Sequence, residues 1–305
     1  MAKWTVEDMP DQAGRTILVT GANSGLGLRS AEALASRGAR VLMGCRNPEK
    51  AAVALEAVKK VAADAAPEIV PLDLADLDEV RVCAQRLTDE LDQLDVLMNN
   101  AGVMAIPHQR TEQGFEMQFG TNHLGHFALT GLLLPILRQA HAPRVVTVSS
   151  VVHRAGRIRF NDWEKKGYSR WFPYIQSKLA HLLFTSELQR RAASAGADLL
   201  AVAAHPGYAA TNLSSGLASG NVVYRLGPKV SDRLFAQPDR MGALPQLYAA
   251  TMPDVGPDDY WGPDGFMERR GWPKRVGRSG AAHDSDAARR LWEASEKLTG
   301  VTYRW

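Results

Sequence analysis

Six short apolar runs, separated by stretches of helical character, constrain the fold of this chain more than any other feature. The runs are almost continuously apolar and rich in β-branched residues, as expected of strands that are buried on both faces. Such strands with helices between them form a mostly parallel sheet that is flanked by helices on both sides. The predicted strands are residues 16–20, 41–45, 69–72, 96–98, 145–148 and 199–203.

The alternation of strands and helices runs unbroken to about residue 205, and no internal boundary is visible. A chain of 305 residues has room for one large α/β domain or two small ones. Because nothing interrupts the alternation, we predict a single doubly wound α/β domain over residues 1–305.

The charge balance argues against a nucleic-acid binder. The chain has 36 Lys and Arg residues against 33 Asp and Glu, a net charge of +3, whereas nucleic-acid binders usually carry a large positive excess on one face. Five basic residues do cluster in one short segment, which we interpret as a solvated loop. They are Arg269, Arg270, Lys274, Arg275 and Arg278.

Cysteine usage and polar interruptions favour a cytoplasmic protein without a membrane span. The two cysteines, Cys45 and Cys83, form no CxxC pair, so we expect reduced thiols and no metal site. The N-terminal segment is acidic and has no apolar run, so we expect no signal peptide. Polar residues and prolines break the two uncharged stretches, 117–137 and 199–224, so we expect neither to cross a membrane.

A glycine-rich turn directly follows the first predicted strand. Residues 20–27 read TGANSGLG and lead into a predicted helix that Gly38 ends. A strand, a glycine-rich turn and a helix N-terminus bind the pyrophosphate of a dinucleotide, because glycine lets the backbone approach the anion and the helix start offers free N–H groups. The turn therefore predicts a Rossmann-type domain, with contacts from Gly21, Asn23, Ser24, Gly25, Leu26 and Gly27.

A tyrosine and a lysine four residues apart predict acid–base chemistry. Tyr174 and Lys178 project from one face of a predicted helix. A free phenol, with a pKa of about 10, is a poor base at neutral pH, and a neighbouring ammonium group lowers that pKa. We therefore predict that Tyr174 is the general acid or base and that Lys178 tunes it. Ser150, at the end of the fifth predicted strand, can stabilise charge on a substrate oxygen.

The order of these motifs resembles that of the short-chain dehydrogenase superfamily over residues 14–265. The turn has the TGxxxGxG spacing of that family, and NNAG at residues 99–102 follows the fourth predicted strand. Further along, HPG at residues 205–207 follows the sixth predicted strand. The resemblance implies a catalytic set that is completed by Asn122, which would keep a water in a proton relay behind Lys178. It also selects Ser150 over Ser149.

The resemblance implies further contacts with the cofactor. Asp73 and Leu74, after the third predicted strand, would contact the adenine. The remaining cofactor-binding residues implied by the family pattern are Asn100, Ala101, Gly102, Tyr174, Lys178, Pro206, Gly207 and Thr211.

The sequence after the second predicted strand favours NADP over NAD. Enzymes that use NAD place an acidic residue there to bind the ribose hydroxyls, and such a carboxylate repels a 2′-phosphate. This chain has Gly-Cys-Arg-Asn at residues 44–47. The guanidinium of Arg46 can pair with the 2′-phosphate, so we predict NADP as the cofactor.

The spacing of the catalytic residues resembles one branch of the family. Ser150 and Tyr174 are 24 residues apart, about twice the usual family spacing, so residues 151–173 form an insertion near the active site. This insertion, the motif TGANSGLG and the later Cys-Arg-Asn resemble the branch of retinol dehydrogenase, WW-domain oxidoreductase and protochlorophyllide reductase. We divide the rest into a Rossmann-type core at 14–265, a substrate lid at 208–240 and a C-terminal tail at 266–305.

We interpret the chain as an NADP-dependent oxidoreductase that interconverts a carbonyl and an alcohol. Aromatic residues in the insertion, Phe160, Trp163, Trp171 and Phe172, and apolar residues in the lid favour a lipophilic small-molecule substrate. The alternatives are a catalytically idle NADP-binding regulator, a nucleotide-sugar epimerase and a protochlorophyllide reductase. A homodimer through the two long helices predicted to begin near Gln118 and Tyr174 is also possible by family analogy.

Overall fold

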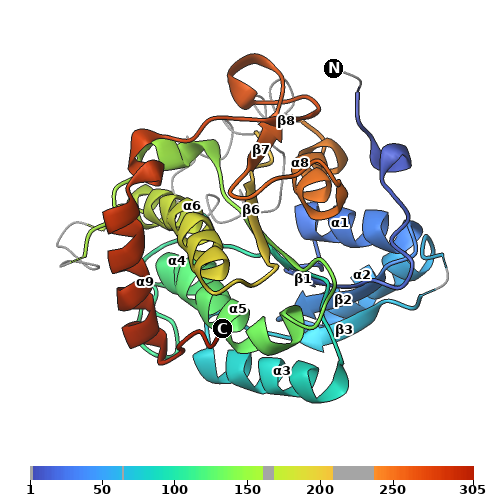
Figure 1. Ribbon diagram of the computed structural model, residues 1–305, viewed down its shortest axis with the longest axis horizontal. Helices are drawn as coiled ribbons and strands as arrows, with labels where there is room; N and C mark the ends of the chain where they lie inside the picture. The colour runs from blue at the N-terminus through green and yellow to red at the C-terminus, as the bar shows by residue number, and fades with distance from the viewer. Residues whose placement is uncertain (1–2, 64, 161–167, 209–236) are drawn as a thin grey trace.

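One eight-stranded sheet forms the centre of the protein in the computed structural model, which describes residues 3–63, 65–160, 168–208 and 237–305 (Figure 1). The strand order is β3-β2-β1-β4-β5-β6-β7-β8. All neighbours are parallel except β8, which is antiparallel to β7. The strands are β1 (Thr16–Thr20), β2 (Arg40–Cys45), β3 (Glu68–Pro71), β4 (Val96–Asn99), β5 (Arg144–Val148), β6 (Leu200–Ala204), β7 (Tyr260–Pro263) and β8 (Pro273–Arg275).

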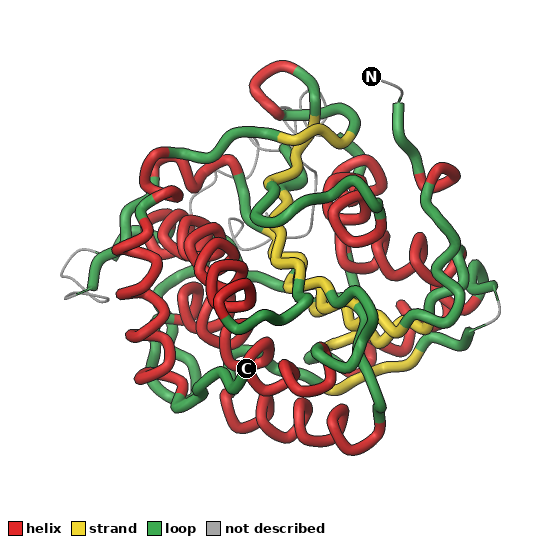
Figure 2. The backbone as a smooth tube through the Cα atoms, viewed as in Figure 1, coloured by secondary structure: helices red, strands yellow, loops and turns green. Residues whose placement is uncertain are grey.

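Helices cover both faces of this sheet, which confirms the predicted doubly wound α/β fold (Figures 1 and 2). One layer holds α1 (Gly25–Ser36), α2 (Pro48–Lys59) and α8 (Asp239–Thr251). The other holds α3 (Leu77–Glu90), α5 (Gly125–Leu137) and α6 (Trp171–Ser194), with α9 (Ser285–Thr299) packed outside α6. The short helix α4 (Met117–Phe119) and the π-helical turn η2 (Gly120–Leu124) lead directly into α5.

The sheet extends further along the chain than the predicted core, which ended at residue 265. Strand β7 is only four residues long and contains a glycine and a proline, and β8 reads Pro-Lys-Arg. Neither has the apolar, β-branched character that marks the first six strands. They are strands because β7 pairs with the buried edge of β6, with Tyr260 opposite Ala203, and β8 returns as a hairpin. The first part of the predicted tail therefore belongs to the sheet.

Helix α9 covers part of α5 and α6, the helices of the predicted dimer contact. Trp292 of α9 is buried and stacks on Phe184 of α6, with ring centroids 5.9 Å apart. Its ring also lies edge-on to Phe127 of α5 at 5.1 Å. Because α9 of the same chain covers this face of α5 and α6, a dimer would have to form through the parts of these helices that α9 leaves exposed. The dimer stays a prediction. Within the described ranges, no helix is both long and apolar enough to cross a bilayer.

Candidate active site

The glycine-rich turn between β1 and α1 fits a dinucleotide pyrophosphate. Gly21 and Gly25 have positive φ angles of 68° and 51°, which glycine adopts most readily. A Cβ on Gly27 would lie 2.3 Å from the carbonyl oxygen of Gly21, so only glycine permits this close approach. Ser24 occupies the N-cap of α1 but makes no side-chain capping hydrogen bond. The N–H groups of the first turn thus remain available for an anion.

The NNAG segment after β4 packs directly against this turn. The backbone N–H groups of Asn100 and Ala101 both donate to the hydroxyl of Thr20, at 2.9 Å each. The Asn100 side chain donates to the Thr20 carbonyl at 2.8 Å. From α8, Gln246 donates to the Asn100 side-chain oxygen at 3.1 Å. Sequence reasoning missed Gln246, because its partner lies 146 residues away along the chain.

Asn122 joins the segment that follows NNAG to α5 and α6. Its side-chain oxygen accepts from the Val103 N–H at 2.8 Å and its amide donates to the Val103 carbonyl at 3.0 Å. The π-helical turn that contains Asn122 directs its backbone carbonyl inward, where ring nitrogens of His126 and His181 lie 2.7 Å away. A π-helical turn inside a helix is often found at a functional site. The side chain of Asn122 is thus fully engaged, and its carbonyl faces the two histidines.

Ser150 and Tyr174 meet at the carboxyl end of β5. Ser150 caps the 3₁₀ turn η3 (Val151–Ala155), and its hydroxyl hydrogen-bonds the Tyr174 phenol. The neighbouring Ser149 is buried and donates instead to the backbone carbonyl of Lys178, at 2.7 Å. The structure therefore brings Ser150, and not Ser149, to the phenol.

Burial dominates the ionisation of Tyr174 and Lys178. The Lys178 ammonium donates to the Val148 carbonyl at 2.9 Å and lies 5.7 Å from the centre of the Tyr174 ring. Burial lowers the pKa of Lys178 to about 7 and raises the pKa of Tyr174 to about 12, against the opposing effect of the Ser150 hydrogen bond. The expectation that Lys178 lowers the phenol pKa is wrong for this arrangement, because the ammonium binds a carbonyl and desolvation prevails.

The residues predicted to bind the adenosine end lie together beyond β2 and β3. Arg46 follows β2 with 64% of its side chain exposed, and its guanidinium lies 3.8 Å from the Asp73 carboxylate. Asp73 follows β3 and accepts from the Ala75 N–H at 2.9 Å. Next to it, Leu74 is buried, and its carbonyl would lie 2.3 Å from a Cβ on Gly125. Gly125 therefore lets α5 approach this loop.

The HPG segment after β6 forms the other side of the site. Gly207 has a φ of 67°, and a Cβ there would lie 2.5 Å from the Arg269 carbonyl. The Pro206 carbonyl accepts from Gln237 at 2.6 Å. His205 is fully buried, and its Nε2 lies 3.1 Å from the Glu268 carboxylate. Residues 209–236, most of the predicted lid, lie outside the described residues. They include Thr211, which was also predicted to bind the cofactor.

Tyr168 anchors the described end of the insertion. Its hydroxyl donates to the buried Glu116 carboxylate at 2.9 Å and accepts from Gln118 at 3.0 Å. Three residues later, Trp171 lies edge-on to Tyr174, with ring centroids 6.3 Å apart. The insertion thus brings an aromatic side chain to Tyr174. Trp163 lies outside the described residues.

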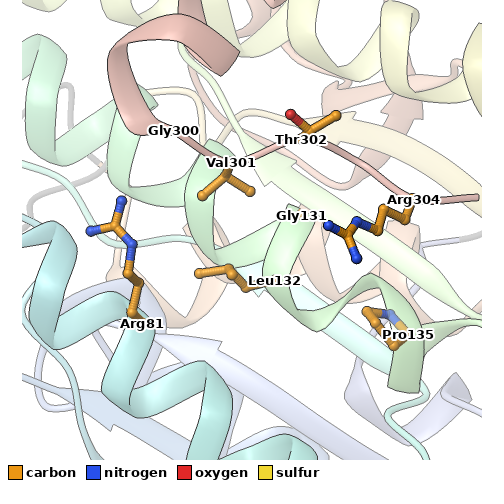
Figure 3. A pocket seen from close by; sticks show the side chains of 8 residues that line it. All are labelled: Arg81, Gly131, Leu132, Pro135, Gly300, Val301, Thr302 and Arg304. Atoms are coloured by element: carbon orange, nitrogen blue, oxygen red, sulfur yellow. The ribbon is translucent and has the colours of Figure 1, made fainter.

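A cavity of about 330 Å³ lies away from this site, between α3, α5 and the C-terminal segment (Figure 3). None of the predicted site residues lines it. Its lining residues are Arg81, Gly131, Leu132, Pro135, Gly300, Val301, Thr302 and Arg304. Across the described ranges, no cluster of His, Cys, Asp and Glu side chains could hold a metal ion.

Comparison of the chain with known proteins identifies its family. A family model described as short chain dehydrogenase matches residues 15–221. The chain belongs to the short-chain dehydrogenase family. As a member, it is an NAD(P)-dependent oxidoreductase that acts on CH–OH groups of small molecules.

Several relatives of this short-chain dehydrogenase cover most of its length. Retinol dehydrogenase 14 of Homo sapiens is 41% identical, over 94% of this chain and 87% of the relative. A crystal structure of an uncharacterised protein from Mycobacterium paratuberculosis is 45% identical, covers both chains completely and has a TM-score of 0.81. A short-chain dehydrogenase from Escherichia coli CFT073, solved with NADPH, is 25% identical over 80% of this chain and 93% of its own, with a TM-score of 0.58. The similarity places this dehydrogenase in the retinol dehydrogenase-like branch.

We predict that Lys178→Met stabilises the cofactor-free dehydrogenase near pH 7. The folded pKa of Lys178, about 7, lies below that of a lysine in the unfolded chain. The cost of burying the charge is therefore complete below pH 7 and is lost as the pH rises toward about 10.4. The variant should gain about 2 kcal/mol at pH 7, since it loses the hydrogen bond to Val148 but removes a larger desolvation cost.

Urea unfolding at pH 7 and pH 10 measures this difference. The gain should disappear and turn into a loss of about 1 kcal/mol at pH 10, where wild-type Lys178 is neutral in the folded state and only the lost hydrogen bond to Val148 remains. Lys59→Met, at an exposed position of α2, serves as the control and should show little pH-dependent change. A Lys178→Met variant that is less stable than wild type at pH 7, or a gain that grows with pH, would contradict the assignment.

Proposed function

We propose that this short-chain dehydrogenase uses NADP(H) to interconvert a lipophilic carbonyl compound and its alcohol. The observation that carries the proposal is the contact between the Ser150 hydroxyl and the Tyr174 phenol, with the Lys178 ammonium one helical turn away. This group lies at the carboxyl ends of the parallel strands, where ligands bind in open α/β sheets.

The ionisation of Tyr174 favours the reduction half of the reaction. A phenol whose pKa is raised to about 12 is protonated at neutral pH, so it can donate its proton to a substrate oxygen. Ser150 would donate a second hydrogen bond to that oxygen and stabilise the negative charge that develops on it. NADPH supplies a hydride when it is bound. In the oxidation direction Tyr174 must lose its proton, and a positive charge on Lys178, 5.7 Å from the ring centre, would favour the phenolate.

The surroundings of Arg46 support NADP over NAD. Its guanidinium is exposed beyond β2, and no acidic residue stands at the strand end itself. The nearby Asp73 carboxylate lies 3.8 Å from one side of the guanidinium, without a hydrogen bond to it. A 2′-phosphate could then bind the remaining N–H groups in the paired geometry that arginine provides. The Escherichia coli relative solved with NADPH is consistent with this choice.

Aromatic residues at the rim support a lipophilic substrate. Trp171 is 44% exposed beside Tyr174, and Tyr208 is 45% exposed just after Gly207. Aromatic side chains in such positions favour apolar ligands. The curated relatives named retinol dehydrogenase fit this choice, because retinol is an alcohol on a long hydrocarbon skeleton.

The alternative functions find less support in the geometry. A catalytically idle NADP-binding protein has no need for the contact between Ser150 and Tyr174. Protochlorophyllide reduction is disfavoured, because Cys45 and Cys83 are both buried and burial raises their thiol pKa values to about 11 and about 12. An epimerase usually carries a larger C-terminal substrate domain, whereas the C-terminal segment here adds two short strands and packs α9 on α6.

Replacing Arg46 by aspartate should shift cofactor preference from NADPH to NADH. The change removes a phosphate partner and introduces a carboxylate that repels the phosphate but accepts from a free 2′-hydroxyl. We expect the KM for NADPH to rise by about tenfold or more, as for the loss of one charge-assisted hydrogen bond. Steady-state kinetics with both cofactors measure the shift, and Arg86→Asp, at an exposed position of α3, is the control. Unchanged KM values for both cofactors would show that Arg46 does not contact the adenosine ribose.

Catalytic efficiency should rise with the chain length of straight-chain aldehydes. Each buried methylene contributes about 0.8 kcal/mol, so kcat/KM should increase by roughly fourfold per carbon until the pocket is filled. A panel of aldehydes of increasing length, with hydrophilic sugar aldehydes for comparison, measures this trend. A flat series, or the highest kcat/KM for the sugars, would remove the lipophilic substrate while leaving the dehydrogenase chemistry intact.

A further inference from the structure

We propose that the loop between β7 and β8 docks the protein on an anionic lipid surface. The loop, residues 264–272, carries two large apolar side chains in water: Phe266 is 82% exposed and Met267 is 60% exposed. Figure 2 shows the 3₁₀ turn η5 (Phe266–Glu268) projecting from the body of the protein at the end of the β7–β8 hairpin. Adjacent apolar side chains at the tip of a loop are unfavourable in water and point to a binding role.

The backbone of this turn is strained and firmly anchored. Met267 and Glu268 both have left-handed conformations, with φ angles of 53° and 55°. Each such residue costs on the order of 1 kcal/mol, and strain of this kind concentrates at functional sites. The Glu268 carboxylate binds Arg154 at 2.8 Å and lies 3.1 Å from His205. The base of the turn is thus held by buried and half-buried partners, while the two apolar side chains point outward.

Cationic side chains flank the apolar tip. Arg269, Arg270 and Lys274 are exposed, and none of them makes an ion pair with another residue in the described ranges. The one exposed acid of the loop, Asp264, accepts a hydrogen bond from the Trp272 N–H. An apolar pair flanked by exposed cations complements an anionic membrane surface, where each basic residue adds about 1 kcal/mol and apolar side chains enter the headgroup region.

The shape of the tip favours lipid over a protein partner. Two side chains on a narrow turn offer far less than the roughly 800 Å² that a stable protein interface buries on each side. The tip is also convex, whereas a peptide or helix partner needs a groove. Insertion of a few apolar side chains between lipid headgroups needs neither a large area nor a groove.

The loop lies at the same edge of the sheet as the candidate active site. The Arg269 carbonyl accepts from the Tyr208 N–H at 2.8 Å, directly after Gly207, and Glu268 binds Arg154 four residues after Ser150. Docking through this loop would therefore turn the substrate side of the sheet toward the lipid. A lipophilic substrate could then pass from membrane to enzyme without crossing bulk water, and this consequence alone rests on the proposed function.

Flotation with lipid vesicles tests the docking. The intact protein is mixed with vesicles of phosphatidylcholine alone and with vesicles that also contain phosphatidylserine. We expect binding to the anionic vesicles that weakens with added salt.

Phe266→Ser/Met267→Ser should lower the affinity by at least tenfold, and Arg269→Ala/Arg270→Ala by roughly tenfold or more. Val53→Ser/Val82→Ser, which removes two exposed apolar side chains from α2 and α3, is the matched control and should bind like wild type.

Activity on a water-soluble aldehyde, measured without vesicles, shows that each variant is folded and should stay at the wild-type level. The proposal is overturned if wild type fails to bind anionic vesicles, if the tip variants bind as well as wild type, or if the control loses binding equally. Loss of activity on lipophilic carbonyls with vesicle binding intact would remove the proposed function and leave the docking in place.

Discussion

A buried chain of hydrogen bonds that begins at the Thr20 hydroxyl fixes the glycine-rich turn relative to α5 and α6. This hydroxyl accepts from two N–H groups of the NNAG segment and lies 2.9 Å from Nε2 of His126. Burial lowers the pKa of His126 to about 4, so the ring is neutral and carries one proton. Its Nδ1 therefore donates to the Asn122 carbonyl, and its Nε2 accepts from Thr20. The carbonyl also lies 2.7 Å from Nε2 of His181 on α6, so hydrogen bonds connect β1, α5 and α6.

Desolvation is the cost of this tight arrangement and also a source of its chemistry. Burial raises the pKa of Tyr174 and lowers the pKa of Lys178, because it disfavours the charged form of each group. A protonated phenol is the form that the proposed reduction needs, because it can donate a proton to a substrate oxygen. Electrostatic interactions are also stronger in such a site than in water. The packed cores on both faces of the sheet stabilise the fold enough to tolerate a buried lysine.

The sequence predicted those features that are encoded locally. The first six strands were found because each is a compact apolar run. The site residues could be predicted because glycine turns and strand ends carry recognisable motifs, and their roles stay a prediction. Strands β7 and β8 were missed because pairing with β6, rather than composition, makes them strands. Gln246 and Glu268 were missed because they reach the site from distant parts of the chain. The predicted lowering of the Tyr174 pKa was wrong, because the four-residue spacing between Tyr174 and Lys178 says nothing about burial. It also gives no sign of the Val148 carbonyl that binds Lys178.

The most direct test of the central claim is the turnover of Tyr174→Phe together with its affinity for NADPH. Removing the hydroxyl takes away the proton donor and little of the packing, so kcat should fall by at least about 10²-fold while NADPH affinity, measured by fluorescence titration, stays close to wild type. Tyr248→Phe on α8, which removes a hydroxyl that donates to Asp254, should keep full activity. Residual turnover of Tyr174→Phe above about one per cent of wild type would contradict the role of Tyr174 as the proton donor.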